Sequence, residues 1–356
     1  MKEEFLRMLP VPSFLFPRAI GLAIEDDGVS FVVNALPQDE FDAVYVPLAE
    51  DVITKGELTK PNDLTGAIVK IVSLTKNKDV VLSLPSDAGF LVRMEVEKEV
   101  PDIIEAVLFA IEEYVPVDPA ELVVDVDNIG LSKEGKQRVV VSAYPEAIVR
   151  SYEDAVRVAG LNPVAAEMSV HSIARALVQQ GGVSSTLVLH VGRTRSRAII
   201  AVGGRPWLVS TIGIGWQKIV DLVARSGEMT EKEALHTIFT YGFSKTHNKE
   251  LFNLMIPVAA SFRDEIVKIV RFWESHKDRS WGRARTIEHV IVTGCGAAIP
   301  GIAEHLGVCL PVYVSTKSPF DELAYNAKNT PIISRSDSFD FTAGVGAYLR
   351  AQERTW

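Results

Sequence analysis

The sequence predicts an α/β protein made of two similar halves, with a smaller α+β segment inserted into the first half. Three observations lead to this fold class. A strand–turn–strand pattern at residues 19–36 recurs at half-chain spacing, at residues 186–202. Between them, residues 80–167 carry strand and helix patterns of their own. Near the end, a strand, a glycine-containing turn and a helix follow one another at residues 288–306.

The composition is that of a globular protein with two or three compact units. The chain has 356 residues, of which 47% are hydrophobic, and a domain averages roughly 150 residues. Its 46 acidic residues against 37 basic ones give a net charge of −9, and no long basic block interrupts the sequence. Nucleic acid is therefore excluded as a main partner, because wrapping it requires a basic surface.

The two hairpins are predicted from apolar runs that flank short polar turns. In the first half, the runs are residues 19–24 and 29–36, and the turn between them is Glu25-Asp26-Asp27-Gly28. In the second half, the runs are residues 186–191 and 197–202 around the polar turn 192–196, with a further strand at 207–214.

The segment between the hairpins predicts a separate α+β unit. Strands are expected at residues 80–85, 122–126 and 139–143, and helices at residues 102–113 and 146–159. The second of these helices is followed by Gly160 and Pro163, which commonly end a helix. Further helices are predicted at residues 231–239 and 258–273, where apolar residues recur at helical spacing.

The late glycine turn allows two interpretations. A strand at residues 288–293 leads into Gly294-Cys295-Gly296-Ala297-Ala298, and a helix is predicted to begin at Pro300. Small residues here let a flat or phosphorylated ligand approach the backbone. They also suit a tight strand-to-helix turn that needs small residues only for packing. The turn matches neither the dinucleotide-binding nor the Walker pattern.

Other classes of site have no support in the sequence. Cys295 and Cys309 form no disulfide framework or zinc spacing, and the seven histidines form no metal constellation. No secretion signal is present at the start, and the charge-free stretch 176–192 is too polar for a membrane span. The basic segment 276–285 fits a solvated loop, with contact to an acidic partner or lipid as the alternative.

Several segments resemble one known family. The order of parts is that of the actin-like ATPases, and the chain is similar to the type IV pilus assembly protein PilM family, relatives of the division protein FtsA. The segments that carry the resemblance are residues 80–85, 112–116, 139–145, 151–163 (SYEDAVRVAGLNP), 169–176, 210–215, 293–301 and 343–346.

The resemblance implies an actin-like (ribonuclease H-like) duplicated fold and a division into subdomains. The expected parts are a first core subdomain at 18–79 plus 168–183, an inserted α+β subdomain at 80–167, a second core subdomain at 184–215 plus 287–350, and a small helical subdomain at 216–286.

The resemblance also locates a nucleotide site, which this sequence has altered. Actin-like ATPases carry a magnesium-binding aspartate at the end of the first strand of each hairpin, where this chain has Ala23 and His190. The acidic turn 25–27 repels phosphate unless a metal intervenes. The positions that match nucleotide-contacting ones are Gly192, Arg193, Thr194, Arg195, Gly215, Glu265, Lys268, Gly294, Gly296 and Ala297. Arginines such as Arg193 and Arg195 on an exposed hairpin are more often solvated, and Glu265 and Lys268 at this spacing are more often an ordinary surface salt pair.

The expected function is therefore a scaffold with a degenerate site rather than an enzyme, with weak ATP or ADP binding or none, and an open question about Mg²⁺. The resemblance implies a cytoplasmic protein, held at the inner face of the membrane by the N-terminal tail of a PilN-like protein. Direct membrane insertion is not expected, while contacts with pilus motor ATPases and self-association stay open. Candidates for the peptide groove are Phe90, Leu91 and Met94, with Ile104 and Leu108 as core alternatives. The alternative function is an active actin-like ATPase, as a nucleotide-driven assembly factor or an FtsA-like filament.

Overall fold

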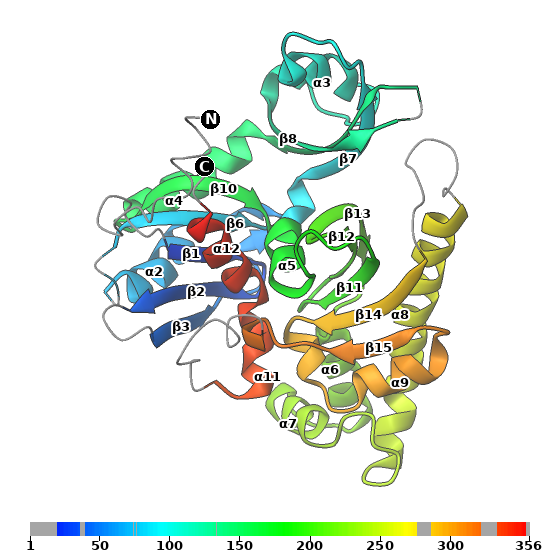
Figure 1. Ribbon diagram of the computed structural model, residues 1–356. Coiled ribbons are helices and arrows are strands. Elements are labelled where there is room, and N and C mark those ends of the chain that lie inside the picture. The colour runs from blue at the N-terminus through cyan, green and yellow to red at the C-terminus, as the bar shows by residue number, and fades with distance from the viewer. Residues whose placement is uncertain are drawn as a thin grey trace.

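The structure is a computed structural model that describes residues 20–35, 40–73, 75, 77–132, 134–275, 286–321 and 333–353. Two lobes each contain a five-stranded sheet, and a smaller three-stranded sheet stands above them (Figure 1). The basic segment predicted as a loop, 276–285, lies outside the described residues. In the part of the chain that the structure describes, no helix combines the length and the hydrophobicity that a bilayer span requires.

The first sheet has the strand order β10-β6-β1-β2-β3. Its strands are β1 (Ile20–Ile24), β2 (Gly28–Ala35), β3 (Glu40–Pro47), β6 (Asp79–Leu84) and β10 (Asn162–Met168). Strands β1 and β2 form the predicted antiparallel hairpin, while β6 runs parallel to both β1 and β10. Two very short strands, β4 (Ile53–Thr54) and β5 (Glu57–Leu58), pair with each other beside this sheet.

The second sheet repeats the pattern with the order β13-β12-β11-β14-β15. Its strands are β11 (Ser185–Val191), β12 (Ser196–Val202), β13 (Arg205–Ile212), β14 (Ile287–Thr293) and β15 (Tyr313–Thr316). In both lobes the first strand pairs with an antiparallel hairpin neighbour on one side and a parallel strand on the other. The structure thus confirms two similar α/β halves.

Helices cover both faces of each sheet. The helices of the first lobe are α2 (Pro61–Val72), α4 (Glu146–Val158), α5 (Ser169–Leu177) and α12 (Thr342–Gln352). Those of the second lobe are α6 (Gln217–Ser226), α7 (Glu231–Tyr241), α8 (Lys249–Ser275), α9 (Ile302–Cys309) and the one-turn α11 (Arg335–Ser338). Short 3₁₀ turns lie at Ser86–Ala88, Pro119–Glu121, Cys295–Ala298 and Phe339–Phe341.

Alternation along β11 explains how the two lobes share a core. Val188 packs into the core that contains α5 and α12, whereas Leu187 and Leu189 pack against the helices of the second lobe. Because successive strand residues point to opposite faces, one strand serves both cores. Helices α5 and α12 therefore lie between the two sheets, as Figure 1 shows at the centre of the molecule.

The inserted unit consists of β7 (Phe90–Val96), α3 (Ile103–Ile111), β8 (Leu122–Leu131) and β9 (Gln137–Pro145). Its sheet has the order β7-β9-β8, and α3 covers one face of it. The predicted insert, 80–167, is longer than this unit, because β6 and β10 at its two ends pair within the first sheet. The apolar side chains of β6 are fully buried there, as is typical of a central parallel strand. The remaining subdomain boundaries stay a prediction.

Two predicted helix limits differ from the observed ones. Helix α9 begins at Ile302 rather than Pro300, because Gly301 adopts a left-handed conformation (φ +76°) that a continuing helix cannot contain. Helix α8 begins at Lys249, well before the predicted residue 258, and runs through Pro257. A proline usually ends a helix, so the sequence pattern predicted too late a start.

Candidate functional site

The turns of the two hairpins face each other across the boundary between the lobes. Thr194 Oγ1 donates a hydrogen bond to Asp26 Oδ2 at 2.5 Å. Arg193 donates to the backbone carbonyls of Leu48 (3.0 Å) and Asp27 (3.4 Å) in the first lobe. Both residues are candidates for contact with phosphate, and in this structure their side chains hydrogen-bond to the opposite lobe.

Four buried charged side chains lie beneath these turns, and we call them the interlobe cluster: Glu25, Asp87, His190 and Arg197. His190 Nε2 lies 3.3 Å from Glu25 Oε2. The Arg197 guanidinium lies 3.4 Å from Glu25 Oε1 and 3.0 Å from Asp87 Oδ2, and only 3% of its side chain is exposed. The cluster therefore joins the second lobe, which carries the two bases, to the first lobe, which carries the two acids.

The cluster fixes the charge states of its members. Burial alone raises the pKa of Glu25, but the charge and hydrogen bond of His190 and the charge of Arg197 outweigh it and lower that pKa to about 2. Burial alone lowers the pKa of His190, and Glu25 reverses this effect and raises it above its usual value. The raised pKa favours the protonated, cationic form of His190, which repels a metal ion, so His190 is a poor replacement for an aspartate at this position.

A second group of acidic side chains fills the adjoining space. Cys295 Sγ donates to Asp27 Oδ2 at 3.0 Å. Burial, followed by the charges of Asp26 and Glu25, raises the pKa of Asp27 to about 6. The cavity lined by Glu25, Asp27, Gly28, Ser30, Tyr45, His190, Gly294, Cys295, Phe339 and Asp340 measures about 10 Å³.

The volume of this cavity shows whether a magnesium-bound triphosphate fits between the hairpins in this structure. A volume of this size holds roughly one water molecule. Ala23, at the end of β1, offers no carboxylate, Glu25 is paired with His190 and Arg197, and Asp27 accepts a hydrogen bond from Cys295. In this arrangement the residues present do not fit the phosphates and metal of a nucleotide.

Gly215 packs closely against the second hairpin, and the start of α6 hydrogen-bonds to it. The backbone N–H groups of Trp216 and Gln217 donate to the carbonyls of Gly192 and Arg193, each at 3.0 Å. A Cβ on Gly215 would clash with the Arg193 carbonyl oxygen. The N-terminal donors of α6, which can bind phosphate in other folds, are thus already paired with the hairpin.

The glycine turn after β14 owes its small residues to packing. A Cβ on Gly294 would lie 2.8 Å from the Val191 carbonyl oxygen, and one on Gly296 would clash with the Val191 side chain. Beside this turn lies a cavity of about 190 Å³, lined by residues 297–304 together with Thr316, Arg335, Ser336 and Phe339. The packing interpretation of the turn is supported, and Ala297 also faces a cavity with room for a small ligand.

Glu265 and Lys268 form the surface pair that was the alternative to nucleotide contact. Lys268 Nζ lies 2.6 Å from Glu265 Oε1, and 69% of the lysine side chain is exposed. Neither residue lines the cavity beside the glycine turn. Their geometry is that of an ordinary i,i+3 pair on the outer face of α8.

A larger groove lies between the insert and the first lobe, and we call it the insert groove. It measures about 240 Å³. Its lining comes from β8 and β9 of the insert, from β6, β10, α4, α5 and α12, and from the β12–β13 turn of the second lobe: Val81, Leu84, Val123, Val124, Asp125, Asp127, Ser142, Tyr144, Val149, Ala165, Ala166, Glu167, Met168, His171, Arg175, Gln180, Gly204, Arg205, Arg350 and Glu353.

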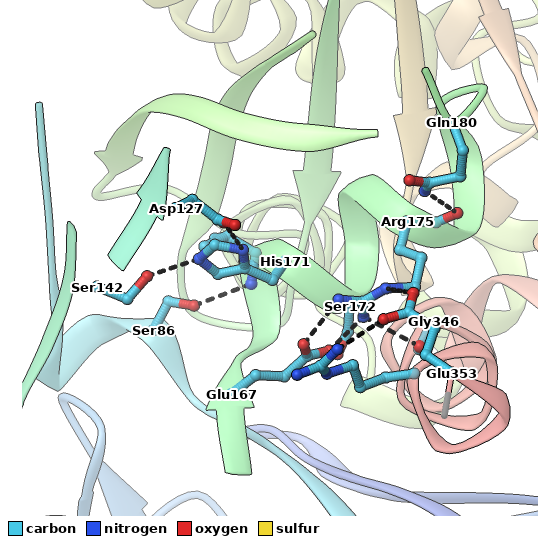
Figure 2. Close-up of polar contacts among 12 residues, drawn as sticks. Ser86, Asp127, Ser142, Glu167, His171, Ser172, Arg175, Gln180, Gly346 and Glu353 are labelled. Carbon is cyan, nitrogen blue, oxygen red and sulfur yellow. Dashed lines mark hydrogen bonds and ion pairs between the residues drawn. The ribbon is translucent and has the colours of Figure 1, made fainter. Parts of the chain in front are cut away.

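Arg175 holds one end of the insert groove in place. Its guanidinium is bidentate to Glu167, with Nη1–Oε1 at 2.5 Å and Nη2–Oε2 at 2.9 Å. It also donates from Nη1 to the Gly346 carbonyl and lies 3.2 Å from Glu353 through Nε. Figure 2 shows this network joining β10, α5 and α12 at the groove. Bidentate pairs of this kind are geometrically rigid, so they fix the wall that a ligand meets.

His171, one turn before Arg175 on α5, makes a second set of polar contacts at the insert groove. Its Nε2 lies 2.6 Å from Ser142 Oγ, and its Nδ1 lies 4.0 Å from Asp127 Oδ2 (Figure 2). Burial lowers the pKa of His171, so the ring is neutral near pH 7. The order serine, histidine, aspartate is that of a hydrolytic triad.

The position of Ser142 argues against nucleophilic catalysis. Ser142 lies in the middle of β9, where it is paired with Leu91 of β7 and Asp125 of β8. A nucleophilic serine usually sits on a sharp turn beside free backbone N–H groups that stabilise the oxyanion. The three side chains are therefore best suited to hydrogen-bonding a ligand laid in the groove.

Phe90, Leu91 and Met94, the residues predicted for the peptide groove, pack in or against hydrophobic cores. Met94 is 2% exposed and packs in the core between the insert sheet and α3. Phe90 packs against the same core, and Leu91 packs against the core of the first lobe. None of the three lines the insert groove. A usable signal was the i,i+4 spacing of His171 and Arg175, which puts both on one face of α5.

Comparisons with known proteins identify the family and the fold. The family model described as type IV pilus assembly protein PilM matches residues 37–352. Comparison with curated proteins found no match. Among solved structures, the chain is similar to a PilM–PilN type IV pilus biogenesis complex, with 22% identity and a TM-score of 0.78 over 94% of this chain and 99% of that chain.

Two further structures share the fold. Ethanolamine utilization protein EutJ from Carboxydothermus hydrogenoformans is 14% identical, with a TM-score of 0.56 over 96% of this chain and 91% of that one. MreB5 of Spiroplasma citri bound to ADP is 11% identical, with a TM-score of 0.56 over 93% and 95%. Identities this low establish the fold alone, and they confirm the predicted actin-like duplicated α/β fold.

Proposed function

The chain belongs to the type IV pilus assembly protein PilM family, and on that premise we propose that it is a scaffold of a type IV pilus or related secretion machine. In this proposal it binds the N-terminal cytoplasmic tail of a PilN-like inner-membrane protein, and it hydrolyses ATP weakly or not at all. The protein then works in the cytoplasm, at the inner face of the membrane, through that partner. A solved structure of similar fold is a PilM–PilN complex.

The observation that carries the proposal is the insert groove. Its wall contains β8, an edge strand of the insert sheet, with Asp125 and Asp127 on one face. An extended peptide can add its backbone hydrogen bonds to such an edge while its side chains meet His171 and Arg175. Because the Arg175 network is already formed, little of the groove has to be ordered when the peptide binds.

The interlobe cluster supports the second part of the proposal, weak or absent hydrolysis. For a magnesium-bound triphosphate to enter between the hairpins, Glu25 and Asp87 must separate from Arg197, and Thr194 from Asp26. Breaking a buried ion pair costs several kcal/mol. Phosphoryl transfer also depends on a positioned metal, but Ala23 has no ligand atom and His190 Nε2 is engaged with Glu25.

Peptide binding is tested by titrating the purified protein with a synthetic peptide of the PilN-like tail. Ala166 is exposed and lines the insert groove, so Ala166→Trp should fill the groove and weaken binding at least tenfold. Ala120, also exposed but on the outer turn of the insert, gives the matched control Ala120→Trp. Equal binding by both variants would place the tail elsewhere.

The alternative, an active ATPase, is favoured by the cavity of about 190 Å³ beside the glycine turn. Calorimetry with ATP and ADP, each with Mg²⁺ and with EDTA, together with a phosphate-release assay, separates the two. We expect no heat, or metal-independent binding without turnover. Micromolar, Mg²⁺-dependent binding with turnover would restore a nucleotide-driven cycle.

A further inference from the structure

Helix α3 carries more apolar surface than the insert covers. Its sequence from Ile103 to Ile111 is IIEAVLFAI, with Glu105 as the single charged residue. Val107 and Ile111 are fully buried against the insert sheet. In contrast, 89% of Phe109 is exposed. A helix that is apolar on every face is normally buried on every face. The face of α3 that carries Phe109 is therefore an exposed apolar surface.

The uncovered face of α3 forms one wall of a second groove, which we call the α3 groove. It measures about 420 Å³. Its floor is apolar and its rim is acidic: the floor consists of Val96, Val100, Pro101, Ala106, Phe109 and Ala110, and the rim of Glu95, Glu97, Asp102 and Glu105. On α3, Asp102, Glu105, Ala106, Phe109 and Ala110 recur at helical spacing, so they share one face.

The acidic residues of the rim differ in their partners. Glu97 is paired with Lys136, 2.6 Å away, whereas Asp102 accepts hydrogen bonds from the first N–H groups of α3. Glu95 alternates with Met94 and Val96, which pack against α3, so its side chain points to the opposite face of the insert sheet, where Arg138 is its cross-strand neighbour. The carboxylates of Asp102 and Glu105, at the start of α3, therefore create a negative potential at the groove mouth, where the low dielectric of the apolar floor focuses it.

We propose that the α3 groove docks a basic, amphipathic segment of a partner protein, with apolar side chains against Phe109 and lysine or arginine side chains at the rim. The charge of the groove selects this occupant. The chain carries a net charge of −9, which disfavours a second copy of itself, and an acidic rim repels an anionic membrane surface. Segments of this kind bind other apolar grooves through anchors at helical spacing.

This interaction is additional to the proposed binding of a PilN-like tail. In β9, Val139 and Val141 point to the α3 side of the insert sheet, whereas Ser142 points to the insert groove on the other side. The two grooves therefore lie on opposite sides of one small sheet. Both can be occupied at once, which allows the insert to hold two partners of the same machine together.

The test uses a fluorescent synthetic helix with leucine and lysine at amphipathic spacing, and a twin in which glutamate replaces each lysine. Fluorescence anisotropy with the full-length protein measures both affinities. We expect the lysine peptide to bind and the glutamate twin not to bind. Phe109→Ser and Glu105→Lys should each weaken the lysine peptide about tenfold, and high salt should weaken it further. The exposure of both side chains leaves folding intact, which thermal melts verify.

The matched control is Glu250→Lys. Glu250, like Glu105, is an exposed glutamate in the first turn of a helix, but it lies on α8 in the second lobe. If it weakens binding as much as Glu105→Lys, the attraction is general charge and the proposal is wrong. Sedimentation of the wild type and anionic-vesicle flotation test the other occupants: a dimer or vesicle binding that Phe109→Ser abolishes would also overturn it. Binding of the PilN-like tail peptide should be the same in all these variants, so the two proposals can fail separately.

Discussion

Arg197 is the side chain on which the interlobe cluster depends. It compensates Glu25 and Asp87 together, and its two contacts come from different nitrogens of one guanidinium. A planar fork suits two carboxylates better than a lysine does. Removing the guanidinium leaves Asp87 without its cationic partner, and leaves Glu25 with His190 alone.

We therefore expect Arg197→Met to destabilise the protein by about 3–5 kcal/mol, the usual cost of removing one partner from a buried ion pair. Urea unfolding measures the loss. The control is Arg150→Met, because the Arg150 guanidinium pairs with Glu146 on the exposed face of α4, and this substitution should change the stability little. A loss below 1 kcal/mol for Arg197→Met would mean that the cluster does not hold the lobes together.

The two buried histidines should give opposite pH dependences of stability. His190 has a raised pKa in the folded protein, so its stabilising contribution is complete below the unfolded pKa of about 6.5 and is lost as the pH rises through the folded pKa. His171 has a lowered pKa, chiefly through burial, so the folded state loses stability as the pH falls below about 6.5.

His190→Gln and His171→Gln test these signs through urea unfolding across that pH range. The stability lost in His190→Gln, relative to wild type, should be largest at low pH and shrink as the pH rises. The stability lost in His171→Gln should shrink, or change sign, as the pH falls. Parallel curves for the two variants would contradict the charge states assigned to both sites.

At the same scale, the sequence predicted which residues face the lobe boundary but not what they do there. The hairpin turns bring Thr194 and Asp26 to that boundary by local strand patterns alone. That Thr194 bonds to Asp26 rather than to phosphate depends on the distance between the lobes, which no local pattern contains. The burial of Met94 in the insert core was not predictable for a similar reason: the face of β7 that α3 covers is decided by packing within the insert.

Among the elements, α12 and α5 form the packed pair between the sheets, and Gly346 sets how closely they approach. A Cβ on Gly346 would clash with the Ser172 carbonyl oxygen. Arg175 donates to the Gly346 carbonyl, so the same close approach also positions the insert groove. A glycine in a helix interior costs about 0.5–1 kcal/mol relative to alanine, a cost that is offset here by the packing.

Gly346→Ala and Gly66→Ala therefore should change stability in opposite directions. Gly346→Ala should destabilise the protein by about 1–3 kcal/mol through overpacking. Gly66 lies within α2 and has nothing within 4 Å of the position of an added Cβ, so Gly66→Ala should stabilise it by about 0.5–1 kcal/mol. Urea unfolding of both variants checks the signs, and stabilisation by Gly346→Ala would show that the helices are free to separate.

Local elements were the most predictable part of the fold. Both hairpins and the helix α4 follow directly from hydrophobic periodicity and turn residues. The membership of β6 was not predictable in the same way, because its parallel pairing joins segments far apart in the sequence. A strand assigned to the insert by chain order thus belongs to the first sheet.

Across the whole molecule, the insert contacts the second lobe as well as the first. Arg93 of β7 lies over the ring of Trp273 of α8, 5.4 Å from its centroid, and Trp207 packs edge-on against the same ring at 6.3 Å. Arg205, the first residue of β13, lies 3.6 Å from Asp127 of β8. These contacts connect the insert to the second lobe, although the insert is joined in the sequence to the first lobe.

We expect Arg93→Met to loosen the insert without unfolding the lobes. Methionine keeps an apolar stem on Trp273 but removes the guanidinium, and a cation–π contact contributes about 0.5–2 kcal/mol. Hydrogen exchange should therefore become roughly 2- to 30-fold faster in β7 and β9, following that energy, and stay unchanged in β1 and β11. Arg150→Met, on α4 below the insert, should leave all four strands unchanged. Faster exchange throughout the lobes would mean that Arg93 stabilises the global fold, and unchanged exchange in β7 would mean that the insert is held by its chain connections to the first lobe alone.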